Sequence, residues 1–362
     1  MFPLVDAPAH LPLIEADQFD AMHRIDYAAH PAYAELVRGS SRVVRFAALR
    51  RFLPSLLLIK IKRLIRYEMI PLHVRRGAGL AGRLRLLMAA LANVFTGSQR
   101  PEPGAQQSPL EVRLRRQGVV VVQISSQDLD TLKQLSKEWF DRLHAHRTAA
   151  ANGPRSFEAS RSYVRWDEDG ALYEGIETLL ERSGVLPAAR AYLGPHARLV
   201  DVNPQINDPS DDFWKRIFPD RDETLPRSAY LHRDASGGDL KAIIYLTEVG
   251  SEQGPFGYVL GSHRLSLSRA EDHVCEANDS NGLAGTEPGT RQLFAGLPPS
   301  LRLKGAFGND LQDNDPASQS LLRSLWSITA PAASIVLFDT KGVHRGGMVA
   351  NGERRVITCV LG

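Results

Sequence analysis

Short β-branched runs separated by turn-rich loops constrain the fold of this chain more than any other feature of its sequence. Six such runs fall in the C-terminal two thirds, and Gly, Pro and Asp are frequent in the loops between them. They do not alternate with helical segments as the strands of a parallel sheet do. The pattern therefore predicts an α+β chain built on an antiparallel double-stranded β-helix, or jelly roll. The runs are 119–124, 198–206, 241–249, 257–261, 333–340 and 354–361.

A helix is expected directly after the first run. Ser125 or Ser126 offers a side-chain oxygen of the kind that caps the first turn of a helix. The apolar residues that follow recur at intervals of three and four, so they share one helical face that can pack on a sheet. These residues are Leu129, Leu132, Leu135, Trp139 and Leu143.

Composition divides the chain near residue 109. Thr96–Pro109 is rich in Pro, Gly, Gln and Ser, which is typical of a linker or long loop. A chain of 362 residues is long for one domain, so one large domain with an added segment is the expected organisation. We predict a mostly helical N-terminal extension over 1–109 and the jelly-roll domain, with flanking helices, over 110–362.

The N-terminal extension contains a strongly basic region. Residues 38–85 hold 13 Lys and Arg against one acid, Glu68, so they carry +12, and the rest of the chain carries −9 to give the total of +3. From 38 to 95, Leu and Ile alternate with these cations at amphipathic-helix spacings, and the cations interrupt every apolar run well short of the ~18 residues that span a bilayer.

Two interpretations of region 38–95 stay open. The helix can pack its apolar face on the C-terminal domain, or it can lie on an anionic membrane surface as a peripheral contact. No nucleic-acid-binding motif accompanies the charge, so no nucleic-acid partner is expected. Co-sedimentation of the full chain, and of one starting near Ser108, with anionic and neutral vesicles distinguishes the two interpretations.

The cysteines and the first residues bear on location. Cys275 and Cys359 lie 84 positions apart and match neither a disulfide framework nor a zinc-binding spacing. They are expected to be packing residues in a reducing compartment. The first twenty residues have no basic stretch followed by an apolar one, so no secretory signal is expected. We predict a cytoplasmic protein, with membrane association as the open alternative.

One histidine and one carboxylate lie close together in the sequence. His232-Arg233-Asp234 is the single His-x-acid triplet among the 11 histidines of the chain. In an extended segment, residues two apart point to the same side, so this imidazole and carboxylate can reach one metal ion. The triplet alone is weak evidence, because an isolated histidine is more often structural than a ligand.

A second histidine and an arginine follow much later in the sequence. His344 lies 110 residues after Asp234, and Arg354 lies ten residues further on, at the start of the last β-like run. Two histidines and one carboxylate on one face of a metal, with the other positions open, are the ligands of non-haem iron(II) sites that activate oxygen. Arginine adds a planar fork that binds a carboxylate through two hydrogen bonds.

With these residues in place, the sequence resembles the phytanoyl-CoA dioxygenase family. The resemblance covers roughly 110–362 and includes four segments. They are the strand and helix at 118–143, the HRD triplet at 232–234, GPFGYVLGSHR at 254–264, and VLFDTKGVHRGGMVANGERRVI at 336–357. The resemblance implies a jelly-roll, cupin-like fold.

The resemblance also implies a function and its cofactors. It assigns iron(II) to His232, Asp234 and His344, and 2-oxoglutarate to Arg354, with Arg355 expected on the opposite face of the same strand. It implies a dioxygenase that consumes dioxygen, releases succinate and CO₂, and hydroxylates an unactivated C–H of a small-molecule or lipid-like substrate. Asp234 disfavours halogenation, because related halogenases have a small residue at this position.

The family pattern leaves the second anchor of 2-oxoglutarate unassigned in this chain. Members often carry a hydroxyl residue two positions after the distal histidine, where this sequence has Gly346. Asn203, Gln205 and Asn207 precede the HRD triplet and are expected to offer polar contacts at the mouth of the site. The alternative to an enzyme is a catalytically silent jelly-roll module, acting as a binding or scaffold protein docked at a membrane.

Overall fold

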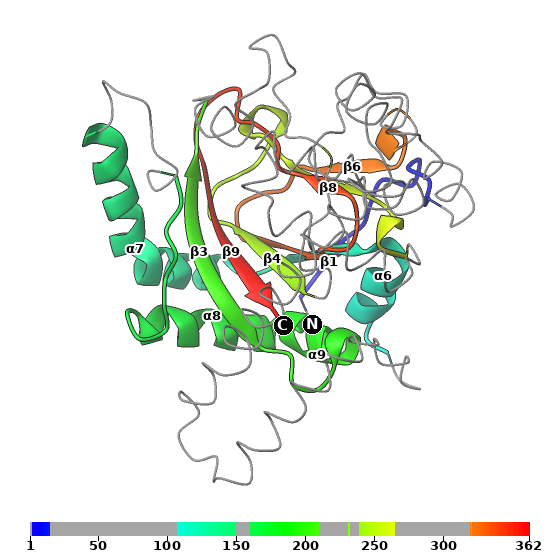
Figure 1. Ribbon diagram of the computed structural model, residues 1–362, viewed down its shortest axis with the longest axis horizontal. Helices are drawn as coiled ribbons and strands as arrows, with labels where there is room; N and C mark the ends of the chain where they lie inside the picture. Colours follow the sequence, from blue (N-terminus) through cyan, green and yellow to red (C-terminus); the bar gives the residue numbers. More distant parts are fainter. Residues whose placement is uncertain are drawn as a thin grey trace, which may run out of the picture. The chain divides into compact units, whose positions relative to one another are not determined.

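Six strands form the larger of two sheets in the computed structural model of this chain (Figure 1). The order is β1-β2-β7-β4-β9-β3, and every neighbouring pair is antiparallel. Five of the six predicted runs are strands of this sheet, as their β-branched composition indicated. The strands are β1 (Leu4–Val5), β2 (Val119–Gln123), β3 (Leu199–Asn207), β4 (Leu240–Tyr245), β7 (Ser334–Asp339) and β9 (Arg354–Leu361).

The structure describes residues 2–14, 107–149, 160–209, 231, 239–264, 319 and 321–362, all of which belong to one unit. The basic region 38–95 and the HRD triplet at 232–234 lie outside the described residues. The boundary near residue 109 stays a prediction, although Leu4–Val5 from the expected extension pairs with β2 in the larger sheet.

The smaller sheet has three antiparallel strands in the order β6-β5-β8. The sixth predicted run is here, as β5 (Phe256–Val259), whereas β6 (Leu325–Ile328) and β8 (His344–Arg345) were not predicted. With four and two residues, these two strands are too short to show an alternating pattern of their own. The larger sheet places its Val336 and Phe338 in one apolar cluster with Tyr258 of the smaller sheet.

Four helices cover the other face of the larger sheet (Figure 1). They are α6 (Pro109–Gln117), α7 (Ser126–Ala149), α8 (Gly170–Arg182) and α9 (Val185–Leu193). The predicted helix is α7, with Ser125 Oγ accepting from the Asp128 N–H at 3.1 Å. Its apolar face packs as expected, with Leu129, Leu132 and Leu143 buried and Leu135 and Trp139 partly buried. Among the described helices, none is long and apolar enough to cross a membrane.

Strand alternation gives β9 two different faces. Ile357, Cys359 and Leu361 pack into the cluster shared with the helices, whereas Val356 packs into the cluster between the two sheets. Residues two apart in a strand share a face, so Arg354 and Thr358 lie on the side of Val356. We call this side of the larger sheet the interior face. Cys359 is a packing residue, as predicted, and burial raises the pKa of its thiol above the ordinary value.

Candidate active site

The two neighbouring arginines of β9 lie on opposite faces of the larger sheet. Arg354 shares the interior face with Val356, and Arg355 shares the helix-covered face with Ile357. The prediction that Arg355 lies on the face opposite Arg354 is confirmed, whereas the role of Arg354 as a cosubstrate ligand stays a prediction.

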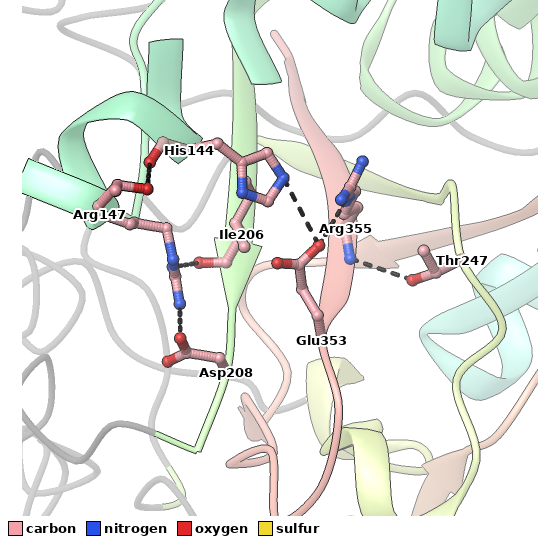
Figure 2. Close-up of polar contacts among 8 residues, drawn as sticks. His144, Arg147, Ile206, Asp208, Thr247, Glu353 and Arg355 are labelled. Carbon is pink, nitrogen blue, oxygen red and sulfur yellow. Dashed lines mark hydrogen bonds and ion pairs between the residues drawn. The ribbon is translucent and has the colours of Figure 1, made fainter. Parts of the chain in front are cut away.

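Arg355 has its own partners at an outer corner of the sheet (Figure 2). Its Nε donates to the carboxylate of Glu353, and its backbone N–H donates to Thr247 Oγ1 at 3.0 Å. His144 Nε2, on α7, lies 3.8 Å from Glu353 Oε1. These contacts connect the end of α7 to the start of β9, so Arg355 has a structural role there.

Arg354 has one donor engaged and another without a partner. Its Nη2 donates to Asn207 Oδ1 at 3.0 Å, across the β3–β9 pair. The residue keeps some exposed surface, but its Nε is shielded from solvent and has no hydrogen-bond partner among the described residues. Burial lowers the pKa of the Arg354 guanidinium from its ordinary value, and the phenol of Tyr245 opposes that shift.

These properties fit a carboxylate ligand. A guanidinium remains charged in proteins, so a partly buried one with an unsatisfied donor gains from an anionic acceptor. A carboxylate accepts two parallel hydrogen bonds from the guanidinium fork. The predicted role of Arg354 is therefore consistent with the donors that the structure leaves open.

His344 lies in β8, opposite Tyr258 of β5, and is 4% exposed. Three aromatic rings surround it, with centroid distances of 5.0 Å to Phe338, 5.6 Å to Phe256 and 6.4 Å to Tyr258, whose ring is nearly parallel. His344 Nδ1 is 2.9 Å from the Gly342 carbonyl oxygen. In a neutral imidazole, an N–H at Nδ1 would pair with that oxygen, which would leave the lone pair on Nε2 as the one that a metal could bind.

The segment 254–264 holds the strand of His344 in position. Ser262 Oγ donates to the Val259 carbonyl at 2.7 Å and accepts from the Val343 N–H at 2.7 Å. The Val259 N–H donates to the Val343 carbonyl at 2.9 Å. The neighbouring His263 is buried, with Nε2 2.9 Å from the Arg115 carbonyl, so it has a structural role. The Gly-Ser-His turn therefore fixes the backbone immediately before His344.

Gly342 leaves no room for a side chain beneath His344. A Cβ at Gly342 would lie 1.8 Å from the Tyr258 hydroxyl, which donates to the Asp339 carbonyl at 3.0 Å. We expect Gly342→Ala to lower the free energy of unfolding by ~1–3 kcal/mol, the usual cost of overpacking. Displacing Tyr258 and the Gly342 carbonyl should also weaken metal binding by ~10–100-fold.

Chemical denaturation and Fe(II) titration of the Gly342→Ala protein test both effects. Gly170→Ala is the matched control, because a Cβ at Gly170 would have no atom within 4 Å apart from its chain neighbours and its own helix backbone. Wild-type stability and metal affinity in Gly342→Ala would contradict the packing that we describe.

The other two predicted iron ligands, His232 and Asp234, lie outside the described residues. Within the part of the chain that the structure describes, no three His, Cys, Asp or Glu side chains form a metal-binding group. The three-ligand site therefore stays a prediction. Of its three residues, the structure describes His344 alone.

A row of polar side chains lies on the interior face of β3. Asn203, Gln205 and Asn207 are paired in register with Thr358, Val356 and Arg354 of β9. Gln205 Nε2 donates to Thr358 Oγ1 at 2.9 Å, and the buried Asn203 Oδ1 has no hydrogen-bond partner among the described residues. The three amides were predicted to provide polar contacts, and they share the interior face with Arg354. Sequence reasoning missed Thr358 and Tyr245, although alternation along their strands was a usable signal.

No protein-family model matches this chain, and no curated protein matches it. Solved structures resemble it, among them the non-haem alpha-ketoglutarate-dependent carbocyclase SnoK from nogalamycin biosynthesis, at 16% identity and a TM-score of 0.41. That match covers 72% of this chain and 87% of SnoK.

Two further structures are similarly distant. EctD from S. alaskensis with bound Fe is 15% identical, with a TM-score of 0.42 over 73% of this chain and 79% of EctD. HygX from Streptomyces hygroscopicus, with nickel and 2-oxoglutarate bound, is 15% identical, with a TM-score of 0.39 over 71% of this chain and 87% of HygX. All three TM-scores are below 0.5.

Proposed function

We propose that this chain is an iron(II)- and 2-oxoglutarate-dependent oxygenase with a jelly-roll core, similar to the phytanoyl-CoA dioxygenase family. The observation that carries the proposal is the buried Arg354 Nε, which faces the interior with no hydrogen-bond partner among the described residues. A charged donor of this kind binds most strongly to an anionic acceptor, and the distal carboxylate of 2-oxoglutarate is one. His344, buried among aromatic rings with its Nδ1 2.9 Å from the Gly342 carbonyl oxygen, is a second residue in keeping with the proposal.

Each residue has a separate task in this proposal. His232, Asp234 and His344 would hold the iron, and Arg354 would bind the distal carboxylate of the cosubstrate. Iron and 2-oxoglutarate, when bound, supply the oxidative decarboxylation that consumes dioxygen and yields succinate and CO₂. Phe256, Tyr258 and Phe338 surround His344 and exclude water from its side of the site.

The substrate that we propose is a small molecule, lipid-like molecules included, whose unactivated C–H is hydroxylated. The carboxylate of Asp234 would occupy a metal position that a halide needs, so hydroxylation is favoured over halogenation. Peripheral membrane contact through 38–95 and a cytoplasmic location remain part of the proposal, resting on the sequence alone.

An anaerobic titration tests the proposed function. Fe(II)-loaded protein should develop the visible charge-transfer absorption of the iron–2-oxoglutarate chelate as 2-oxoglutarate is added. Admitting air should then yield succinate. A protein that binds neither Fe(II) nor 2-oxoglutarate would be the silent scaffold module instead.

A further inference from the structure

The site needs a second hydrogen-bond donor for the distal carboxylate of the cosubstrate. A carboxylate has about four lone-pair positions, and a single arginine satisfies only some of them. Two nearby positions cannot contribute, because Gly346 has no side chain and Val356, two residues after Arg354, is apolar. A hydroxyl on the interior face of a neighbouring strand would supply the second donor.

Tyr245 meets that requirement from β4. It is paired in register with Val356 and packs in the same cluster between the sheets, so its ring is on the face of Arg354. Arg354 is two residues from Val356, so it is a diagonal neighbour of Tyr245 across the β4–β9 pair. Diagonal neighbours lie ~7–8 Å apart between their Cα atoms, which long side chains can span. A carboxylate between the two side chains can contact both.

The present partners of the Tyr245 hydroxyl are weak. It lies 3.4 Å from the Ile328 carbonyl oxygen and 3.4 Å from the Phe256 nitrogen, at the long limit for a hydrogen bond. Tyr245 is 1% exposed, so water does not compensate. Burial raises the pKa of its phenol above the ordinary value, and Arg354 opposes that rise. The phenol therefore stays protonated at neutral pH and can donate.

Asn207 holds the guanidinium from the other side. Its Oδ1 accepts from Arg354 Nη2 at 3.0 Å, which orients the fork along the β3–β9 pair. An oriented guanidinium loses less rotational freedom when it binds its ligand. Asn207 is thus a positioning residue for Arg354, and it does not need to touch the ligand.

We propose that Tyr245 donates the second hydrogen bond to the distal carboxylate of 2-oxoglutarate, while Asn207 positions Arg354 to bind the same group. The inference rests on the proposed function, because it needs 2-oxoglutarate to bind at this site. It assigns the second residue that binds the distal carboxylate, which the sequence alone left open. With this assignment, residues from three strands, β3, β4 and β9, form the distal-carboxylate site.

Two probes separate a carboxylate contact from a structural effect. 2-Oxoglutarate and 2-oxobutyrate chelate a metal through the same carboxylate and oxo groups, but 2-oxobutyrate has no distal carboxylate. Anaerobic titrations of the Fe(II)-loaded full chain with each compound give their two affinities. Tyr245→Phe should weaken 2-oxoglutarate binding by roughly ten- to a hundredfold, since one hydrogen bond to a charged group is lost, and leave 2-oxobutyrate binding unchanged. Asn207→Ala should show the same selectivity with a smaller loss.

Tyr173→Phe is the matched control. This substitution also removes a buried tyrosine hydroxyl that donates to a backbone carbonyl, here the carbonyl of Val164 at 3.0 Å. Tyr173, however, lies on α8, outside the site. Its two affinities should equal those of the wild type. Unchanged 2-oxoglutarate affinity in Tyr245→Phe, or an equal loss for both compounds, would overturn the inference and leave the proposed function intact. Failure of the wild type to bind either compound would instead remove the proposed function.

Discussion

Arg354→Ala should abolish most of the affinity for 2-oxoglutarate while leaving Fe(II) binding nearly intact. The guanidinium is buried at its Nε and engages Asn207 through Nη2, so the cosubstrate would bind it with two charge-assisted hydrogen bonds. Removing one partner of such a buried pair costs ~3–5 kcal/mol, a factor of roughly 150 to 5000 in affinity. Titration of Fe(II)-loaded protein with 2-oxoglutarate measures this loss, and a separate Fe(II) titration measures the metal.

Two further variants make the Arg354 prediction specific. Arg354→Lys should recover only part of the affinity, because an ammonium cannot reproduce the two parallel bonds of a guanidinium. Arg355→Ala removes the same charge from the other face of β9, where Arg355 pairs with Glu353, and should bind 2-oxoglutarate like the wild type (Figure 2). The reverse result, with Arg355→Ala damaging and Arg354→Ala silent, would place the cosubstrate on the helix-covered face.

Much of the fold was predictable because its signals are local. Each of the six predicted runs is a strand, since near-continuous runs of apolar, often β-branched residues suit a sheet that is buried on both faces. The helix after Ser125 was predictable for the same reason, from a cap and one apolar face. The strands β6 and β8 were missed, because pairing with β5 gives them a conformation that their own few residues do not encode.

The candidate site was predictable only in its chemistry. The order of His232, Asp234, His344 and Arg354 indicated a metal and a carboxylate, and the family resemblance favoured Arg354 over Arg355. The arrangement of neighbouring side chains was not predictable. Asn207 lies 147 positions from Arg354, and their contact depends on the register of β3 with β9, which tertiary pairing sets.

His344→Ala should abolish metal binding and, with it, all activity. His344 is the one predicted metal ligand in the described part of the chain, and its Nδ1 is 2.9 Å from the Gly342 carbonyl, a contact that would present Nε2 to a metal. Removing a residue that only hydrogen-bonds to a metal ligand lowers metal affinity by ~10–100-fold. Removing the ligand itself should therefore lower metal affinity by more than roughly a hundredfold.

Titration with Co(II), followed by its visible absorption, measures the effect of His344→Ala without dioxygen or 2-oxoglutarate. His146→Ala is the control, because His146 is exposed at the end of α7. Circular dichroism should show that both variants fold, since the alanine at 344 removes a ring from a cluster that Phe256, Tyr258 and Phe338 still fill. A folded His344→Ala protein that binds Co(II) as tightly as the wild type would show that His344 is a packing residue. The metal would then have to lie elsewhere, and Arg354 would be left to bind a carboxylate that no iron site requires.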